Sequence, residues 1–153
     1  MNYTDTYDSP LGKIYLAGDD AGLISLSFTQ QLSGDAAGSV LDPAKRWLDV
    51  YFAGSVPDFM PALNLKGTSF QVRVWECLQL IHYGCTTTYG EIARELSCRS
   101  AQAVGQAVSR NPIAIIIPCH RVIGVDSKLT GYSGGLERKA ALLELEGVKI
   151  PPC

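Results

Sequence analysis

The residues of this chain best suited to chemistry are Cys119 and its neighbours His120 and Arg121. A cysteine is a nucleophile only as its thiolate, and a neighbouring imidazole or cation lowers the pKa of the thiol. Cys119 follows the apolar run 113–117 and Pro118, so we expect a buried strand or extended segment that ends just before the cysteine. The alternative is a small core cysteine, because adjacent residues of an extended chain point to opposite sides.

The segments that flank the cysteine favour a reactive site. Asn111-Pro112 precedes Pro118-Cys119-His120-Arg121-Val122, and Gly131-Tyr132-Ser133-Gly134-Gly135 follows it. In this order the segments resemble the active-site signature of the O6-alkylguanine-DNA alkyltransferases. The similarity extends from about Phe70 to Glu146 and, more loosely, over the N-terminal part. Members of this family move an alkyl group from a guanine oxygen in DNA onto their own cysteine, so the resemblance implies a methylated-DNA–protein-cysteine methyltransferase that acts once per molecule.

The resemblance also implies roles for particular residues. Glu146 would orient His120, which would take the thiol proton of Cys119 through a water molecule. Asn111 would brace the cysteine loop, and Tyr89 would donate a proton to the departing base. The substrate contacts would come from Tyr132, Ser133, Val122 and Gly134. Arg121 is assigned a structural role, and neither a cofactor nor a metal is implied.

A helix-turn-helix is predicted where the resemblance places DNA contacts. Thr88 and Glu91 have capping-box spacing, and Ser100 begins a second short helix over 101–109. Four Ala or Gly residues and no charge make that helix unsuited to reading base edges, but suited to the minor groove. Its contacts would come from Ala101, Gln102, Ala103 and Gly105, with Arg99 and Arg110 at its ends on phosphates. The alternative is a helix that packs tightly inside the domain.

Gln102 departs from the family pattern, because an arginine finger usually fills this position. In that family the damaged nucleotide leaves the stack, and the arginine takes its place. Glutamine is shorter and neutral, although its amide can still donate to or accept from the orphaned cytosine. We therefore predict weaker base flipping, or a narrower substrate range, than in a relative that has the arginine.

The charge distribution indicates the kind of partner, and the cysteine content indicates the cellular compartment. Residues 1–67 hold four Lys or Arg against eight Asp, and residues 68–153 hold nine against seven acids, so a polyanion should meet the C-terminal half. Five cysteines and a polar N-terminus argue for reduced thiols and a cytoplasmic protein. We expect double-stranded DNA with O6-alkylguanine, and also O4-alkylthymine, as candidate partners. We expect no membrane, no obligate protein partner and a monomer.

The order of patterns predicts an α+β chain with two domains. Alternating segments at 3–7, 11–17 and 22–28 predict an antiparallel meander, and Asp42-Pro43 predicts the N-cap of a helix that ends at Gly54. Thr68 should cap a helix that Gly84 closes, and 136–146 should form the last helix. The resemblance implies a ribonuclease H-like structural domain at 1–64. It also implies a mostly helical, winged-helix-like domain at 65–153 for DNA binding and alkyl transfer.

Three other functions share parts of this pattern. The family has a non-catalytic branch that binds alkylated guanine, although Cys119 argues against that branch. A Cys-His-Glu thiol hydrolase would act on acyl substrates and turn over repeatedly. A winged-helix regulator would use Cys119 to sense alkylation, but it would need a helix that reads sequence.

Overall fold

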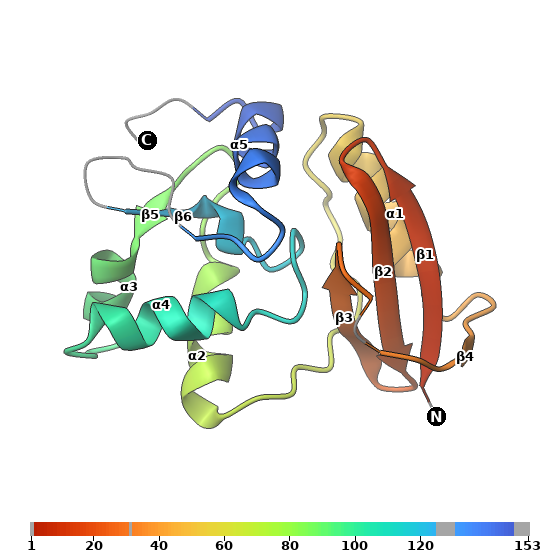
Figure 1. Cartoon of the computed structure of the whole chain (residues 1–153), viewed down its shortest axis with the longest axis horizontal. Coiled ribbons are helices and arrows are strands. Elements are labelled where there is room, and N and C mark those ends of the chain that lie inside the picture. The colour runs from red at the N-terminus through yellow and green to blue at the C-terminus, as the bar shows by residue number, and fades with distance from the viewer. Residues whose placement is uncertain (1, 31, 125–130, 149–153) are drawn as a thin grey trace. The chain divides into compact units, whose positions relative to one another are not determined.

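The chain divides into two compact units, Met1–Lys66 and Gly67–Cys153. The structure is a computed structural model that describes residues 2–30, 32–124 and 131–148. Figure 1 shows a sheet with one helix in the first unit and a mainly helical second unit. This arrangement confirms the predicted α+β class. Within the described ranges, no helix is both long and apolar enough to cross a bilayer.

The first unit is organised on a four-stranded sheet in the order β3-β2-β1-β4. The strands are β1 (Tyr3–Ser9), β2 (Gly12–Asp19), β3 (Gly22–Ser27) and β4 (Asp35–Ala36). The first three form the predicted antiparallel meander, and alternate residues of β2 such as Ile14 and Leu16 are buried. The short β4 pairs in parallel with β1, in a segment that the sequence indicates as a loop.

Helix α1 (Asp42–Phe52) packs on this sheet, where Tyr7 Oη of β1 donates to Asp49 at 2.6 Å. The predicted N-cap is wrong by one position, because Leu41 is the N-cap and Asp42 is already helical. No side chain caps this end. Pro43 lacks an N–H and has its φ preset for the helix, so it can begin the first turn without a capping bond.

The second unit contains α2 (Ser69–Leu78), β5 (Thr87–Thr88), α3 (Tyr89–Glu95), α4 (Ala101–Ser109), the 3₁₀ turn η1 (Cys119–Arg121), β6 (Val122–Ile123) and α5 (Leu136–Leu145). Strands β5 and β6 pair in parallel, an element that the sequence does not indicate. This pairing joins the start of the helix-turn-helix to the segment that leaves η1. Residues 125–130, whose polar sequence is typical of a turn, lie outside the described residues.

Side-chain caps begin three helices where the sequence predicts them. Thr68, Thr88 and Ser100 accept hydrogen bonds from the backbone N–H groups three residues on, at 3.1, 3.2 and 3.0 Å. The box at Thr88 is only half formed, because Glu91 accepts from Thr87 Oγ1 at 2.8 Å instead of returning to the N-cap. The caps therefore fix the starts of α2, α3 and α4.

Helix α2 ends at Leu78, earlier than the predicted stop at Gly84. Its buried Trp75 donates from Nε1 to the carbonyl of Ala107 at 2.8 Å. The indole thereby ties α2 to α4. A buried Trp N–H needs such an acceptor.

The apolar run before Cys119 is a buried turn, which overturns the predicted strand or extended segment. The N–H of Ile116 donates to Ala114 at 2.8 Å, and that of Ile117 donates to Ile113 at 3.1 Å. Ile115 lies between them with a φ of 70°, which strains a β-branched residue. β-branched residues indicate burial as readily as they indicate a strand. The flanking prolines cannot donate to a sheet.

Candidate active site around Cys119

Cys119 begins η1 directly after this turn and is 6% exposed. Its exposed part opens on a cavity of about 510 Å³. In a 3₁₀ turn successive side chains project about 120° apart, so three adjacent side chains can point in three directions. Cys119 faces the cavity in this way, whereas His120 and Arg121 contact the buried carboxylate of Glu146.

The cavity brings together predicted residues from four parts of the second unit. Cys119 shares it with Tyr89, with Ala101, Gln102 and Gly105 of α4, and with Tyr132 and Ser133. A Cβ added at Gly105 would lie 3.7 Å from Cδ1 of Tyr89, which is an ordinary van der Waals contact, so the phenol ring lies directly over this position of α4. Gly131 of the predicted signature segment also lines the cavity. Gln106, Val108 and Ser109 line it too, and they were not predicted as site residues.

Other predicted residues lie away from this cavity. Val122 is fully buried behind it, and Gly134 is half-buried. Arg99 and Arg110 are exposed at the two ends of α4. Ala103 and Arg110 instead line a neighbouring groove of about 550 Å³ between α2 and α4.

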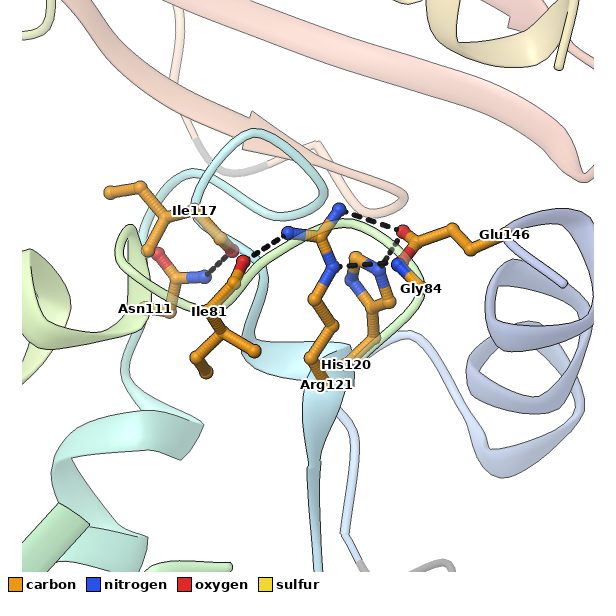
Figure 2. Close-up of polar contacts among 7 residues, drawn as sticks. All are labelled: Ile81, Gly84, Asn111, Ile117, His120, Arg121 and Glu146. Atoms are coloured by element: carbon orange, nitrogen blue, oxygen red, sulfur yellow. Dashed lines mark hydrogen bonds and ion pairs between the residues drawn. The ribbon is translucent and has the colours of Figure 1, made fainter. Parts of the chain in front are cut away.

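Glu146 is the centre of a buried ion cluster, which Figure 2 shows. His120 Nε2 lies 2.6 Å from Oε2, and Arg121 donates from Nε to Oε1 at 2.8 Å and from its Nη2 to Oε2 at 3.1 Å. Arg121 also donates to the carbonyl of Ile81 at 2.7 Å, and its guanidinium lies 5.7 Å from the ring centre of Tyr83. The sequence did not predict that Arg121 holds Glu146.

The carboxylate of Glu146 is ionised in this cluster. Burial by itself would raise its pKa, but the hydrogen bonds and charges of His120 and Arg121 outweigh burial and lower the pKa to about 2. An ionised carboxylate only accepts hydrogen bonds. The proton of the 2.6 Å contact therefore lies on His120 Nε2.

His120 is neutral near pH 7, because its pKa is lowered. Burial is the main cause, and the positive charges of Arg121 and Lys139 add to it, while Glu146 opposes them. In a neutral ring with the proton on Nε2, Nδ1 carries the lone pair. Nδ1 is buried and has no hydrogen-bond partner within the described part of the chain. His120 is thus in the state that a general base requires.

Asn111 clamps the turn that carries Cys119. Its Nδ2 donates to the carbonyl of Ile117 at 2.8 Å, and its Oδ1 accepts from the N–H of Ile113 at 3.0 Å. Burial raises the pKa of the Cys119 thiol, against lowering by a hydrogen bond from Asn111 and by the charge of Lys139. The resting thiol is therefore protonated, and a base is needed to make it a nucleophile.

The other cysteines differ in state. Cys77 and Cys98 carry free thiols, as Cys119 does, and the pKa of Cys77 is raised by burial. Cys85 is disulfide-bonded, so the expectation of reduced thiols is wrong for this residue.

Two models of known protein families match this chain. The model of the 6-O-methylguanine DNA methyltransferase DNA-binding domain matches residues 69–148, and that of the ribonuclease-like domain of the same proteins matches 2–65. The chain belongs to the 6-O-methylguanine DNA methyltransferase family. The predicted resemblance to this family is thus confirmed. The ribonuclease-like description also agrees with the ribonuclease H-like fold predicted for the N-terminal domain.

Relatives of this chain are similar to it over nearly their whole length. A methylated-DNA–protein-cysteine methyltransferase of Mycobacterium tuberculosis is 48% identical, over 99% of this chain and 96% of the relative. One of Methanosarcina acetivorans is 46% identical, over 95% and 98%. A crystal structure of Mycobacterium tuberculosis OGT in complex with DNA has a TM-score of 0.87 at 48% identity, covering 94% of this chain and 92% of that one. These names agree with the predicted methyltransferase activity.

Proposed function

We propose that this chain repairs O6-alkylguanine in double-stranded DNA by moving the alkyl group onto Sγ of Cys119, once per molecule. The observation that carries the proposal is the place of Cys119 in the wall of a cavity beside α4, next to a buried His120–Glu146 pair. A relative of known structure that is 48% identical was crystallised in complex with DNA. The family match supports guanine O6 as the source of the alkyl group.

The transfer is an in-line displacement. His120 Nδ1 takes the thiol proton of Cys119 through a water molecule, while Glu146 holds the ring and balances its new charge. Sγ then bonds to the alkyl carbon as the bond from that carbon to O6 breaks. Tyr89 donates a proton to the departing guanine, and the proton on His120 replaces it through solvent. The product thioether is a poor leaving group, so the protein is consumed.

The reacting atom must be brought out of the duplex before it reaches Cys119. Extruding a nucleotide costs a few kcal/mol. Helix α4, which has small side chains and no charge, lines the cavity, and its Gln102 is exposed. We infer that α4 enters the minor groove without sequence preference. Arg99 and Arg110 then contact phosphates at the ends of this helix.

The cavity offers contacts for an extruded base. Tyr132 lines it, and its Oη is buried without a hydrogen-bond partner in the described ranges. Leaving such a group unpaired costs about 1–3 kcal/mol, which a bound guanine can recover. Ser133 is an exposed residue of the same wall. We also assign substrate contacts to backbone groups of Val122 and Gly134, which lie outside this wall, on the family resemblance.

Every residue assigned here comes from the second unit. We therefore assign DNA binding and alkyl transfer to 65–153 and a structural role to 1–64. Because one copy supplies the whole site, we infer that the protein acts as a monomer. We also infer that it acts without a cofactor and in the cytoplasm.

The stoichiometry of repair tests the proposed function. A duplex with one O6-methylguanine is mixed with increasing protein, and the remaining lesion is counted by chromatography after digestion. We expect one lesion removed per protein molecule, followed by no further loss. Lesion binding without any loss would contradict the proposal and favour the non-catalytic sensor, and repeated turnover would also contradict it.

Replacing Gln102 with arginine is expected to tighten binding to the damaged duplex about five- to tenfold. A charge-assisted hydrogen bond contributes about 1 kcal/mol more than a neutral one, and the longer side chain fills the vacated stack. Binding to damaged and undamaged duplexes is measured by fluorescence anisotropy at fixed salt. Gln106→Arg adds the same charge one turn along α4 and should tighten both equally. An unchanged ratio of the two affinities in Gln102→Arg would count against the flipping role.

A further inference from the structure

Lys139 of α5 is fully buried, although it is a lysine. Its ammonium Nζ donates to the carbonyl of Val122 at 2.6 Å and to that of Gly131 at 3.5 Å. Val122 follows η1 directly, and Gly131 lines the cavity that contains Cys119. The ammonium is therefore held behind the cavity lining, where it bonds a carbonyl that follows the Cys119 turn and a carbonyl of a lining residue.

Burial makes this ammonium costly, since a buried charge costs several kcal/mol to desolvate. Burial lowers the pKa of Lys139 to about 8, against the opposing effect of Cys119. Lys139 and Cys119 also affect their neighbours. The charge of Lys139 lowers the pKa of His120. The pKa of Tyr132 is raised by its own burial and by Cys119, which also accepts a hydrogen bond from Asn111. Charged groups retained at such a cost are often functional.

The two basic side chains that follow Cys119 in the chain make their contacts elsewhere. Arg121 donates to Glu146 and to the carbonyl of Ile81, and His120 directs its Nε2 proton to the same carboxylate. Within the described residues, the charge that lowers the pKa of Cys119 is that of Lys139. Lys139 is also placed to interact with a thiolate, because its ammonium bonds the carbonyl of Val122, three residues after Cys119, and that of Gly131, which lines the same cavity as Cys119.

We propose that Lys139 is a positioning residue for alkyl transfer, whose buried ammonium stabilises the Cys119 thiolate from behind the cavity wall. The inference rests on the proposed function, in which Cys119 is the acceptor. In this account His120 removes the proton, and Lys139 balances the negative charge left on sulfur until the bond to carbon forms. The carbonyls of Val122 and Gly131 fix the ammonium in place and keep it charged.

The test measures thiolate formation without DNA. Cys119 is alkylated with iodoacetamide from pH 6 to 10, and the Cys119 peptide is quantified by mass spectrometry in the parent, Lys139→Met and Lys139→Gln. Glutamine keeps a donor for the carbonyl of Val122 but brings no charge. Arg73→Met removes an exposed charge from α2 and is the matched control.

Both Lys139 variants are expected to raise the apparent pKa of Cys119 by about 1 to 3. The rate at pH 7 then falls at least about tenfold, while Arg73→Met stays within about twofold. An unchanged profile in Lys139→Met would overturn the proposal, as would a parent-like profile in Lys139→Gln, which would leave only a hydrogen-bonding role. If neither variant folds, the pH profile of Cys119 alkylation in the parent protein is the test. The proposal requires two coupled ionisations in that profile, those of Cys119 and Lys139. A single ordinary thiol ionisation would overturn it. Because no DNA is used, this failure is distinct from a failure to repair.

Discussion

Replacing Arg121 with methionine is expected to lower the free energy of unfolding by about 3 to 5 kcal/mol. The change removes the paired cation of Glu146, whose side chain is 0% exposed, and it leaves the carbonyl of Ile81 without this donor. Breaking a buried ion pair by deleting one partner costs this much, because an uncompensated charge remains. Denaturant unfolding followed by circular dichroism measures the effect.

The matched control is Arg73→Met, because Arg73 is exposed and donates to one carbonyl, that of Leu96, at 3.2 Å. We expect it to change stability by less than about 0.5 kcal/mol. Equal losses in the two variants would contradict the assignment of Arg121 to the cluster around Glu146.

The acid limb of stability gives an independent check of the same cluster. Glu146 has a lowered pKa of about 2 against an ordinary value of 4.5, so its contribution is present above about pH 4.5 and is lost as the pH falls towards 2. The difference corresponds to about 3 kcal/mol. In Arg121→Met the pKa of Glu146 rises, so this acid-dependent contribution becomes smaller.

Replacing Glu146 with glutamine is expected to slow alkyl transfer about 10²- to 10⁴-fold. The carboxylate fixes the proton of His120 on Nε2 and balances the imidazolium that forms, whereas an amide does neither reliably. The single-turnover rate constant with a methylated duplex, at a temperature at which the variant is folded, measures the loss. Glu144→Gln is the control, since Glu144 is exposed two residues earlier.

The pH dependence of this rate separates a chemical role from a structural one. Glu146 raises the pKa of His120 by its hydrogen bond and charge, so its removal lowers that pKa. The acid limb of the rate profile should therefore move to lower pH in Glu146→Gln, while the plateau falls. A rate near that of the parent, or a fall without any shift of the limb, would contradict the base role of His120.

Local signals made much of the fold predictable. Thr68 and Ser100 each have a side chain that can satisfy the free N–H groups of a helix start, and both cap as expected. Gly147 has a φ of 73° directly after Glu146, where the last helix was predicted to stop. Such rules depend on a few neighbouring residues, so they can be read without tertiary structure.

The turn at 113–117 could not be predicted in the same way. Its geometry depends on the clamp by Asn111 and on the strained φ of Ile115, which the surrounding core imposes. Short apolar runs do not distinguish a strand from another buried segment. The same tertiary dependence explains why the pairing of β5 with β6 was missed.

The spacing of residues in the last helix indicates that Lys139 is buried. Lys139, Leu142, Leu143 and Glu146 recur at three- and four-residue spacing, so they share one face of α5. Both leucines are apolar and buried, and a lysine on their face is buried with them. Arg121 gave no comparable signal, because only the 3₁₀ turn brings it to the same carboxylate as His120.

The measurement that tests the account most directly is intact-protein and peptide mass spectrometry after reaction with a duplex that carries one O6-methylguanine. The account predicts a gain of one methylene mass on the Cys119 peptide, saturating at one per molecule and absent in Cys119→Ser. A methyl group on another cysteine would contradict it. So would an unmodified Cys119 in protein that binds the lesion.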